Sequence, residues 1–453
     1  MFRIASSRLS SRAASSVSST ASFLASLTAK PSPVSLTPLA ATSFRSYGNG
    51  LELDKSMANP DAINMINYAL NHARTDKSFG SYGLGLLVLK HCLTIELTEG
   101  KDPKNENSKG IALLAMSTLE YERGEYDIAL EKLQSIHELT NAYLGVRVAA
   151  LEAEAGLYLE LGQDDKASAI ADKCVEVVEK QKTDDDDEDF KALILRAKAL
   201  KGLIELVKGS IESAQRRYDS SHLVCRKHSC TSKLTVGYIG TAALSYGEFL
   251  YLKQNYSMAK EVYTSVLKGA SDIKKFGNPY LGACNMNLEG LMMGALCSLG
   301  QLETYQGNYG NAEKALTQAL TLAEETYGEK HPKVGVVLTS IALMYRRRAM
   351  EERTSSLMVQ EGLYRKVIDI LKVTETESEG SAPVVERSDI AAIARGGYAE
   401  VLSVQENRKS EGEKLKKLAE TIWKNRRLTL DEALLDLESS KISIIDPRIS
   451  RIL

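Results

Sequence analysis

The stretch from Leu299 to Leu320, LGQLETYQGNYGNAEKALTQAL, decides the fold of this 453-residue chain. Gly300 and Ala312 stand where two antiparallel helices would approach closely, and Gly307 with Asn308 supplies a turn between them. A single hairpin of this kind cannot bury its own apolar face. The rest of the chain is therefore expected to repeat it.

The same pattern recurs four times before this stretch. Each second helix carries an alanine, and a glycine precedes it at the turn, except in the fourth unit, where Gln254 takes that place. The alanines are 38, 47, 45 and 53 residues apart, which predicts extended helices or long connections. The repeat-defining residues are Gly124, Tyr126, Ala129, Gly162, Ala167, Gly209, Ala214, Tyr256, Ala259, Gly300, Gly307, Tyr309 and Ala312.

This spacing of small and aromatic residues resembles the tetratricopeptide repeat. A sixth unit, HPKVGVVLTSIALMYRRRA from His331, resembles the repeats of kinesin light chains, in which a His-Pro pair opens the first helix. It carries about six extra residues between Arg346 and Met358, which predicts a distorted hairpin or overrunning helices. The resemblance covers residues 111–372 and implies an all-α, right-handed α-solenoid of antiparallel hairpins.

Around this core the chain divides into four parts. Residues 1–47 are expected to be a disordered transit peptide, and residues 48–107 an N-terminal helical cap. Residues 108–376 are expected to form about six repeat hairpins. Residues 377–453 would form a C-terminal helical cap, which presents a wetter face at the end of the stack, followed by an apolar tail.

The first 47 residues have the composition of a mitochondrial transit peptide. They hold five basic residues, no acidic residue and many serines, and Phe2, Ile4 and Leu9 share one face of a short helix. Arg45 lies three residues before Gly48, as at the processing sites of such peptides. We expect a mitochondrial protein, in the matrix by default. The alternatives are a chloroplast transit peptide and a disordered tail with no targeting function.

Charge and motifs argue against several functions. Without residues 1–47 the chain keeps 52 basic and 59 acidic residues, so an RNA-binding role like that of pentatricopeptide proteins is the less favoured alternative. The longest apolar runs are too short to span a bilayer. The sequence holds no phosphate loop, nucleophile elbow or HExxH motif, so we expect no enzyme and no cofactor.

One cluster of metal-ligating residue types interrupts this pattern. His222, Cys225, His228 and Cys230 are four potential zinc ligands within nine residues. Such a short span does not readily wrap four donors around one ion, so a junction between repeats is the favoured interpretation. A zinc or redox function there is a weak alternative. The other four cysteines stand singly in apolar segments and are expected in the core.

The resemblance also implies a binding surface. In tetratricopeptide stacks the first helix of each hairpin lines a concave groove that holds an extended peptide or partner helix. The chain lacks the Lys/Asn/Arg set with which chaperone-binding members grip terminal carboxylates, so we do not expect a carboxylate-clamp cochaperone. The groove residues are predicted to be Leu114, Thr118, Tyr121, Glu152, Leu159, Arg196, Leu244, Glu248, Tyr251, Gln301, Thr304, Thr339, Leu343 and Arg346.

The tail KISIIDPRISRIL, residues 441–453, is too apolar to be left in water. It is expected either to fold back onto the stack or to bind another protein. Taken together, these features predict a noncatalytic scaffold or assembly factor in mitochondria that binds partner proteins in its groove.

Overall fold

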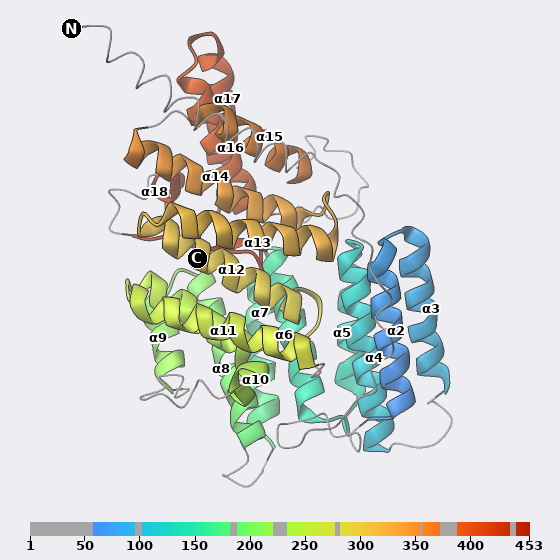
Figure 1. Cartoon of the computed structure of the whole chain (residues 1–453). Helices are drawn as coiled ribbons and strands as arrows, with labels where there is room; N and C mark the ends of the chain where they lie inside the picture. Colours follow the sequence, from blue (N-terminus) through green and yellow to red (C-terminus); the bar gives the residue numbers. More distant parts are fainter. Residues whose placement is uncertain are drawn as a thin grey trace, which may run out of the picture.

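The computed structural model describes residues 58–95, 102–181, 188–220, 233–276, 281–353, 356–371, 387–434 and 441–453. These residues form a stack of antiparallel helix hairpins, shown in Figure 1, that winds into an α-solenoid. The only strands among them are two short ones in the tail. The prediction of an all-α solenoid is therefore confirmed.

The hairpins follow one another along the chain. The first pair is α2 (Pro60–Asp76) with α3 (Phe79–Ile95), and the last is α16 (Ser388–Ser403) with α17 (Lys409–Ile422). Between them lie α4 (Pro103–Glu122) with α5 (Tyr126–Ser135), α6 (Leu144–Glu160) with α7 (Asp164–Glu179), α8 (Glu188–Val207) with α9 (Ile211–Ser220), α10 (Lys233–Leu252) with α11 (Tyr256–Phe276), α12 (Leu288–Tyr305) with α13 (Tyr309–Tyr327), and α14 (Pro332–Glu352) with α15 (Leu357–Leu371).

Five of the turns share one hydrogen-bonding pattern. At Gly307 the main-chain N–H donates to Thr304 O, and the next N–H, of Asn308, donates to Glu303 O. Gly124, Gly162, Gly209 and Gln254 make the equivalent bonds, and all five residues have positive φ. Gln254 thus occupies the glycine position of the fourth turn in the left-handed conformation, at φ 62°.

Close packing explains the glycines inside the first helices. A Cβ added to Gly300 would lie 2.6 Å from Leu316 Cγ, and one added to Gly202 would lie 2.6 Å from Tyr218 Cζ. Side chains there would push the two helices of a hairpin apart. The predicted anchors Ala129, Ala167, Ala214, Ala259 and Ala312 are each 0% exposed.

The extra residues of the sixth unit extend its first helix, α14. Helix α14 continues without a break to Glu352, and Arg353 ends it in the left-handed conformation at φ 50°. The extra residues therefore lengthen the first helix. Of the two alternatives that the sequence left open, the structure has the second.

The solenoid turns far enough for its beginning to meet its later helices. Arg74 at the end of α2 lies 3.3 Å from Glu289 of α12, and Lys77 donates to Glu324 O of α13 at 3.2 Å. The rings of Tyr121 and Tyr327 meet edge to face. The first helices of the hairpins therefore enclose an interior, and the mark C in Figure 1 places the last residues in the middle of the molecule, beside α12.

Candidate partner-binding groove

The concave side of the solenoid is occupied by the chain's own tail. After α18 (Leu430–Leu434), residues 441–453 form a hairpin in which β1 (Ile445–Asp446) pairs antiparallel with β2 (Arg451–Ile452). Residues 444–453 are all buried. The sequence left open whether the tail folds back onto the stack or binds another protein, and in the structure it folds back.

A buried ion cluster holds the turn of this hairpin. Lys333, at the start of α14, contacts the Glu160 carboxylate of α6 at 2.9 Å and donates to Pro447 O at 2.7 Å. Ser450 donates to the other oxygen of Glu160 at 3.1 Å. Arg387, just before α16, contacts that oxygen at 2.8 Å. The cluster thus joins three distant hairpins to the tail.

The burial of this cluster shifts its proton affinities. Burial would raise the pKa of the Glu160 carboxyl, but Lys333 and Arg387 together outweigh it and hold that pKa at about 2. Burial lowers the pKa of the Lys333 ammonium to about 8, although Glu160 counteracts the shift. Glu160 is therefore an anion throughout the neutral range, and it remains paired inside the solenoid.

Arg448 anchors the hairpin to the fourth repeat. Its guanidinium, 0% exposed, lies 2.7 Å from the Glu248 carboxylate of α10 and 2.9 Å from Asp446 of its own hairpin. It also donates to Thr241 O and to the Ser245 hydroxyl, both at 3.2 Å. Burial raises the pKa of the Glu248 carboxyl well above its usual value, although Arg448 opposes the shift.

Two further groups hold the strands. Arg451 contacts Asp389 of α16 at 3.2 Å and Asp164 of α7 at 2.9 Å. The Gln301 amide of α12 accepts from the Ile445 N–H at 2.8 Å and donates to the Ile445 carbonyl at 2.9 Å. Gln301 therefore forms hydrogen bonds with the main chain of β1, as a neighbouring strand would.

A second segment fills the groove on the N-terminal side. Residues 281–287, between α11 and α12, contain a 3₁₀ turn at Cys284–Met286. The Cys284 N–H donates to Thr118 of α4 at 3.0 Å, and Arg196 of α8, paired with Glu152 of α6, donates to Leu281 O at 2.9 Å. This insertion accounts for part of the 53-residue step between Ala259 and Ala312.

Eleven of the fourteen predicted groove residues are buried, and Gln301, Leu343 and Arg346 are half-buried. Thr118, Arg196, Glu248 and Gln301 contact the two filling segments through the hydrogen bonds given above. Leu159 contributes its carbonyl to Arg451. The spacing of the repeats thus places the predicted groove residues on the concave side. Their role in binding a partner stays a prediction.

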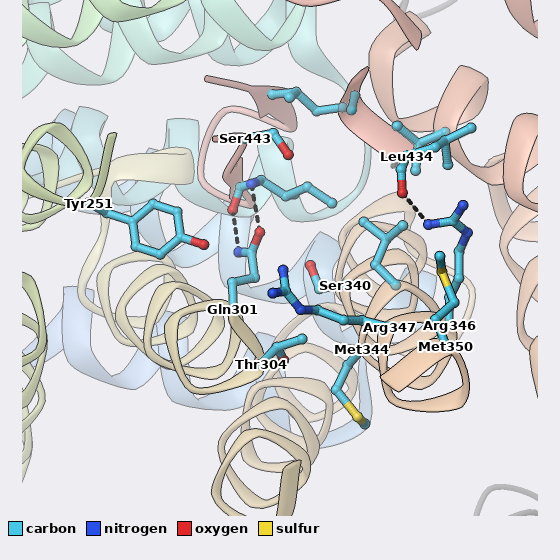
Figure 2. Close-up of a pocket in the computed structure, with 15 residues that line it drawn as sticks. Tyr251, Gln301, Thr304, Ser340, Met344, Arg346, Arg347, Met350, Leu434 and Ser443 are labelled. Carbon is cyan, nitrogen blue, oxygen red and sulfur yellow. Dashed lines mark hydrogen bonds between the residues drawn. The ribbon is translucent and has the colours of Figure 1, made fainter. Parts of the chain in front are cut away.

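A small cavity of about 50 Å³ remains between the tail and α10, α12 and α14. Five predicted groove residues line it, and Figure 2 shows Gln301 bonded to the tail and Arg346 donating to Leu434 O. Those five are Tyr251, Gln301, Thr304, Leu343 and Arg346. Met344 and Met350 of α14 contribute apolar walls.

Sequence reasoning missed the ions that hold the tail. The residues concerned lie up to 291 positions apart, so no local spacing relates them: they are Glu160, Lys333, Arg387, Arg448 and Arg451. One signal was present: the two arginines of the tail stand among isoleucines, and a buried arginine requires a buried acid. That signal indicates the need for partners without naming them.

The structure offers no comparable geometry for the other candidate sites within the residues that it describes. The zinc candidate His222, Cys225, His228 and Cys230 lies outside the described residues, as does the segment 1–47. Within the described ranges no group of three or more His, Cys, Asp or Glu side chains is placed to hold a metal ion. Cys92, Cys174, Cys284 and Cys297 are buried, as expected of core residues. No helix of the described part is long and apolar enough to cross a membrane.

Comparison with known proteins agrees with this geometry. Residues 291–353, which span most of α12, all of α13 and α14, and Arg353, match the model of the tetratricopeptide repeat. This stretch of the chain is a tetratricopeptide repeat region. Among 33 matching chains of solved structures is BtubC (BKLC) from P. vanneervenii, with 13% identity and a TM-score of 0.39 over 57% of this chain and 90% of that chain. A search of the curated proteins finds no match.

Tetratricopeptide repeats are protein-interaction modules, and their helical hairpins are typically noncatalytic. In this chain the groove that such modules offer to a peptide already holds a polypeptide, namely residues 441–453. The groove contacts this segment in three ways. It takes a strand main chain at Gln301, isoleucine side chains between the helices, and an arginine at Glu248.

Proposed function

We propose that this protein is a noncatalytic scaffold or assembly factor that binds partner proteins inside mitochondria. The tail hairpin in the groove carries the proposal, because it shows that the concave surface holds an extended polypeptide through both main-chain and side-chain contacts. The basic, serine-rich and acid-free composition of residues 1–47 supports the mitochondrial location.

A partner segment that uses the groove has to take the place of the tail. We propose that such a segment has the chemistry of the tail itself. It would be an extended strand with isoleucine-like side chains, in which an arginine stands two positions after an acidic residue, as Arg448 follows Asp446 after Ile445.

Affinity purification from isolated mitochondria, with and without nuclease, tests the proposal. We expect protein partners that survive nuclease treatment, whereas recovery of RNA alone would support the nucleic-acid alternative. Recovery of neither, from mitochondria that contain the protein, would contradict the scaffold function. Import of a reporter fused to residues 1–47 tests the location separately.

A pair of variants tests whether partners use the groove. Arg448→Ala removes the ion that anchors the tail to Glu248, so groove partners should be recovered in larger amounts. Lys441→Ala changes an exposed residue at the start of the same tail and serves as the matched control. Equal recovery with both variants would place the partners on another surface. Circular dichroism must show the helical content of the wild type in each variant.

A further inference from the structure

The tail hairpin holds two arginines, three positions apart, against carboxylates from distant parts of the chain. Arg451 contacts Asp164, the first residue of α7, at 2.9 Å and Asp389 of α16 at 3.2 Å. Arg448, in the turn of the same hairpin, contacts Glu248 of α10 at 2.7 Å. One short segment therefore pairs with carboxylates of three separate helix hairpins.

Both arginines use several nitrogen atoms of their guanidinium groups at once. Besides its two carboxylates, Arg451 donates to Leu159 O at 3.2 Å. Arg448 donates to Thr241 O and to the Ser245 hydroxyl, both at 3.2 Å, in addition to its carboxylates. A lysine carries its charge on a single nitrogen and cannot match such a spread of acceptors. The acceptors therefore fit arginine better than lysine at both positions.

The helices supply no substitute for these two cations. Glu248 and Asp389 are 0% exposed, and Asp164 is half-buried. Within the described ranges, the three carboxylates form ion pairs with no cation other than the tail arginines. The interior cations Lys333 and Arg387 pair with the carboxylate of the buried ion cluster instead. A segment that displaced the tail without bringing cations would leave buried carboxylates unpaired, which is strongly unfavourable.

We propose that the groove selects partner segments that carry two arginines three positions apart, in the pattern Arg-x-x-Arg. This inference rests on the proposed function, because it specifies the partner of the same groove. The first arginine pairs with Glu248, and the second bridges Asp164 and Asp389. The main chain around the first arginine lies against Lys333, which donates to Pro447 O at 2.7 Å in the tail. Lysine at either arginine position leaves part of this set of acceptors without a donor.

Peptide binding to the full-length Arg448→Ala variant measures this selectivity. The substitution removes one anchor of the chain's own tail and leaves the carboxylates of the groove intact. The probe is a synthetic peptide of residues 441–453 with a fluorophore at its N-terminus, and fluorescence anisotropy reports its binding. We expect saturable binding of this parent peptide, and a dissociation constant at least about tenfold larger when the peptide carries Arg448→Lys or Arg451→Lys. A peptide with Lys441→Ala is the matched control and should bind like the parent.

A double-mutant cycle assigns the second arginine to its place in the groove. Asp164→Asn in the same full-length variant should weaken the parent peptide but have little effect on a peptide with Arg451→Ala, because that peptide already lacks the contact. Asp165→Asn changes the neighbouring exposed carboxylate and should leave both affinities unchanged. Circular dichroism must show the helical content of the wild type in each protein variant.

Three results would overturn the proposal. The first is equal affinity for the arginine and lysine peptides. The second is an Asp164→Asn chain that weakens the parent and the Arg451→Ala peptide equally, which would mean that position 451 binds elsewhere. The third is a folded Arg448→Ala chain that binds none of the peptides, which would mean that the groove accepts only its own linked tail. Selective peptide binding without any partner from mitochondria would instead support the inference and contradict the proposed function alone.

Discussion

Burial fixes the charge state of His331 at the start of α14. The side chain is 8% exposed, and its Nδ1 accepts from the Lys333 N–H at 3.2 Å, so it caps the helix as a neutral ring. Burial and the neighbouring cations Arg387 and Lys333 lower the pKa of His331 to about 3, against the opposing effect of Glu160. The folded protein therefore takes up a proton there far less readily than the unfolded chain.

This difference predicts how stability depends on pH. A depressed pKa in the folded state means that stability is fully present above the ordinary histidine pKa of 6.5 and falls as the pH decreases towards 3. Between pH 7 and pH 5 the free energy of unfolding should fall by about 2 kcal/mol through this group. Urea unfolding at a series of pH values measures the slope.

His331→Asn isolates the effect, because asparagine also caps helices but does not titrate. The variant should lose stability at pH 7 through its lost packing, and its change in stability between pH 7 and pH 5 should lack the loss that His331 contributes. An unchanged slope in the variant would contradict the assignment to His331. Glu160, with its pKa at about 2, contributes only below this window.

Single residues also show what the sequence could not predict in the groove. Gln301 and Glu248 are placed on the concave side by the spacing of the repeat alone, because that spacing fixes which helix face points inward. Their contacts with Ile445 and Arg448 depend on where the tail returns, about 144 and 200 positions along the chain. No local pattern carries that information.

At the scale of the element, the turns were the most predictable feature. In five hairpins the first helix ends at a left-handed residue, and glycine is the residue that adopts that conformation without steric cost. Gly124, Gly162, Gly209 and Gly307 therefore identify the hairpins from sequence. The fourth turn shows that the surrounding packing can hold a glutamine in the same conformation at Gln254.

We expect Gly162→Ala to lower the free energy of unfolding by about 1 kcal/mol, since an alanine in the left-handed region clashes with its own carbonyl. A Cβ at Gly162 meets no other atom within 4 Å, so the cost comes from the main chain alone. Denaturant unfolding, monitored by circular dichroism, measures it.

Gly362→Ala is the control for this substitution. Gly362 lies inside α15, is exposed, and likewise has no atom near an added Cβ. Alanine is the better helix former, so this change should raise stability by about 0.5–1 kcal/mol. The same sign for both substitutions would contradict the role assigned to the turn conformation.

The whole molecule is a solenoid closed around its own C-terminal hairpin. Six apolar side chains of the tail, from Ile442 to Leu453, are at most 3% exposed, and each contributes about 1.5–3 kcal/mol on burial. Together they are large enough to offset the roughly 4–15 kcal/mol that a separate peptide loses on association. The hairpin should therefore stay in place even without its covalent link.

A protease site inserted between Leu434 and Lys441 tests this expectation on the full chain. After cleavage of the folded protein at neutral pH, the peptide of residues 441–453 should co-elute with the solenoid in gel filtration. The same cleavage in an Arg448→Ala background should release it, because Asp446 and Glu248 then lack their buried cation. Lys441→Ala should retain the peptide, since Lys441 is exposed. Release of the peptide from the otherwise unchanged chain would show that the groove holds its tail only through the connecting segment, and would remove the basis for inferring a partner of the same chemistry.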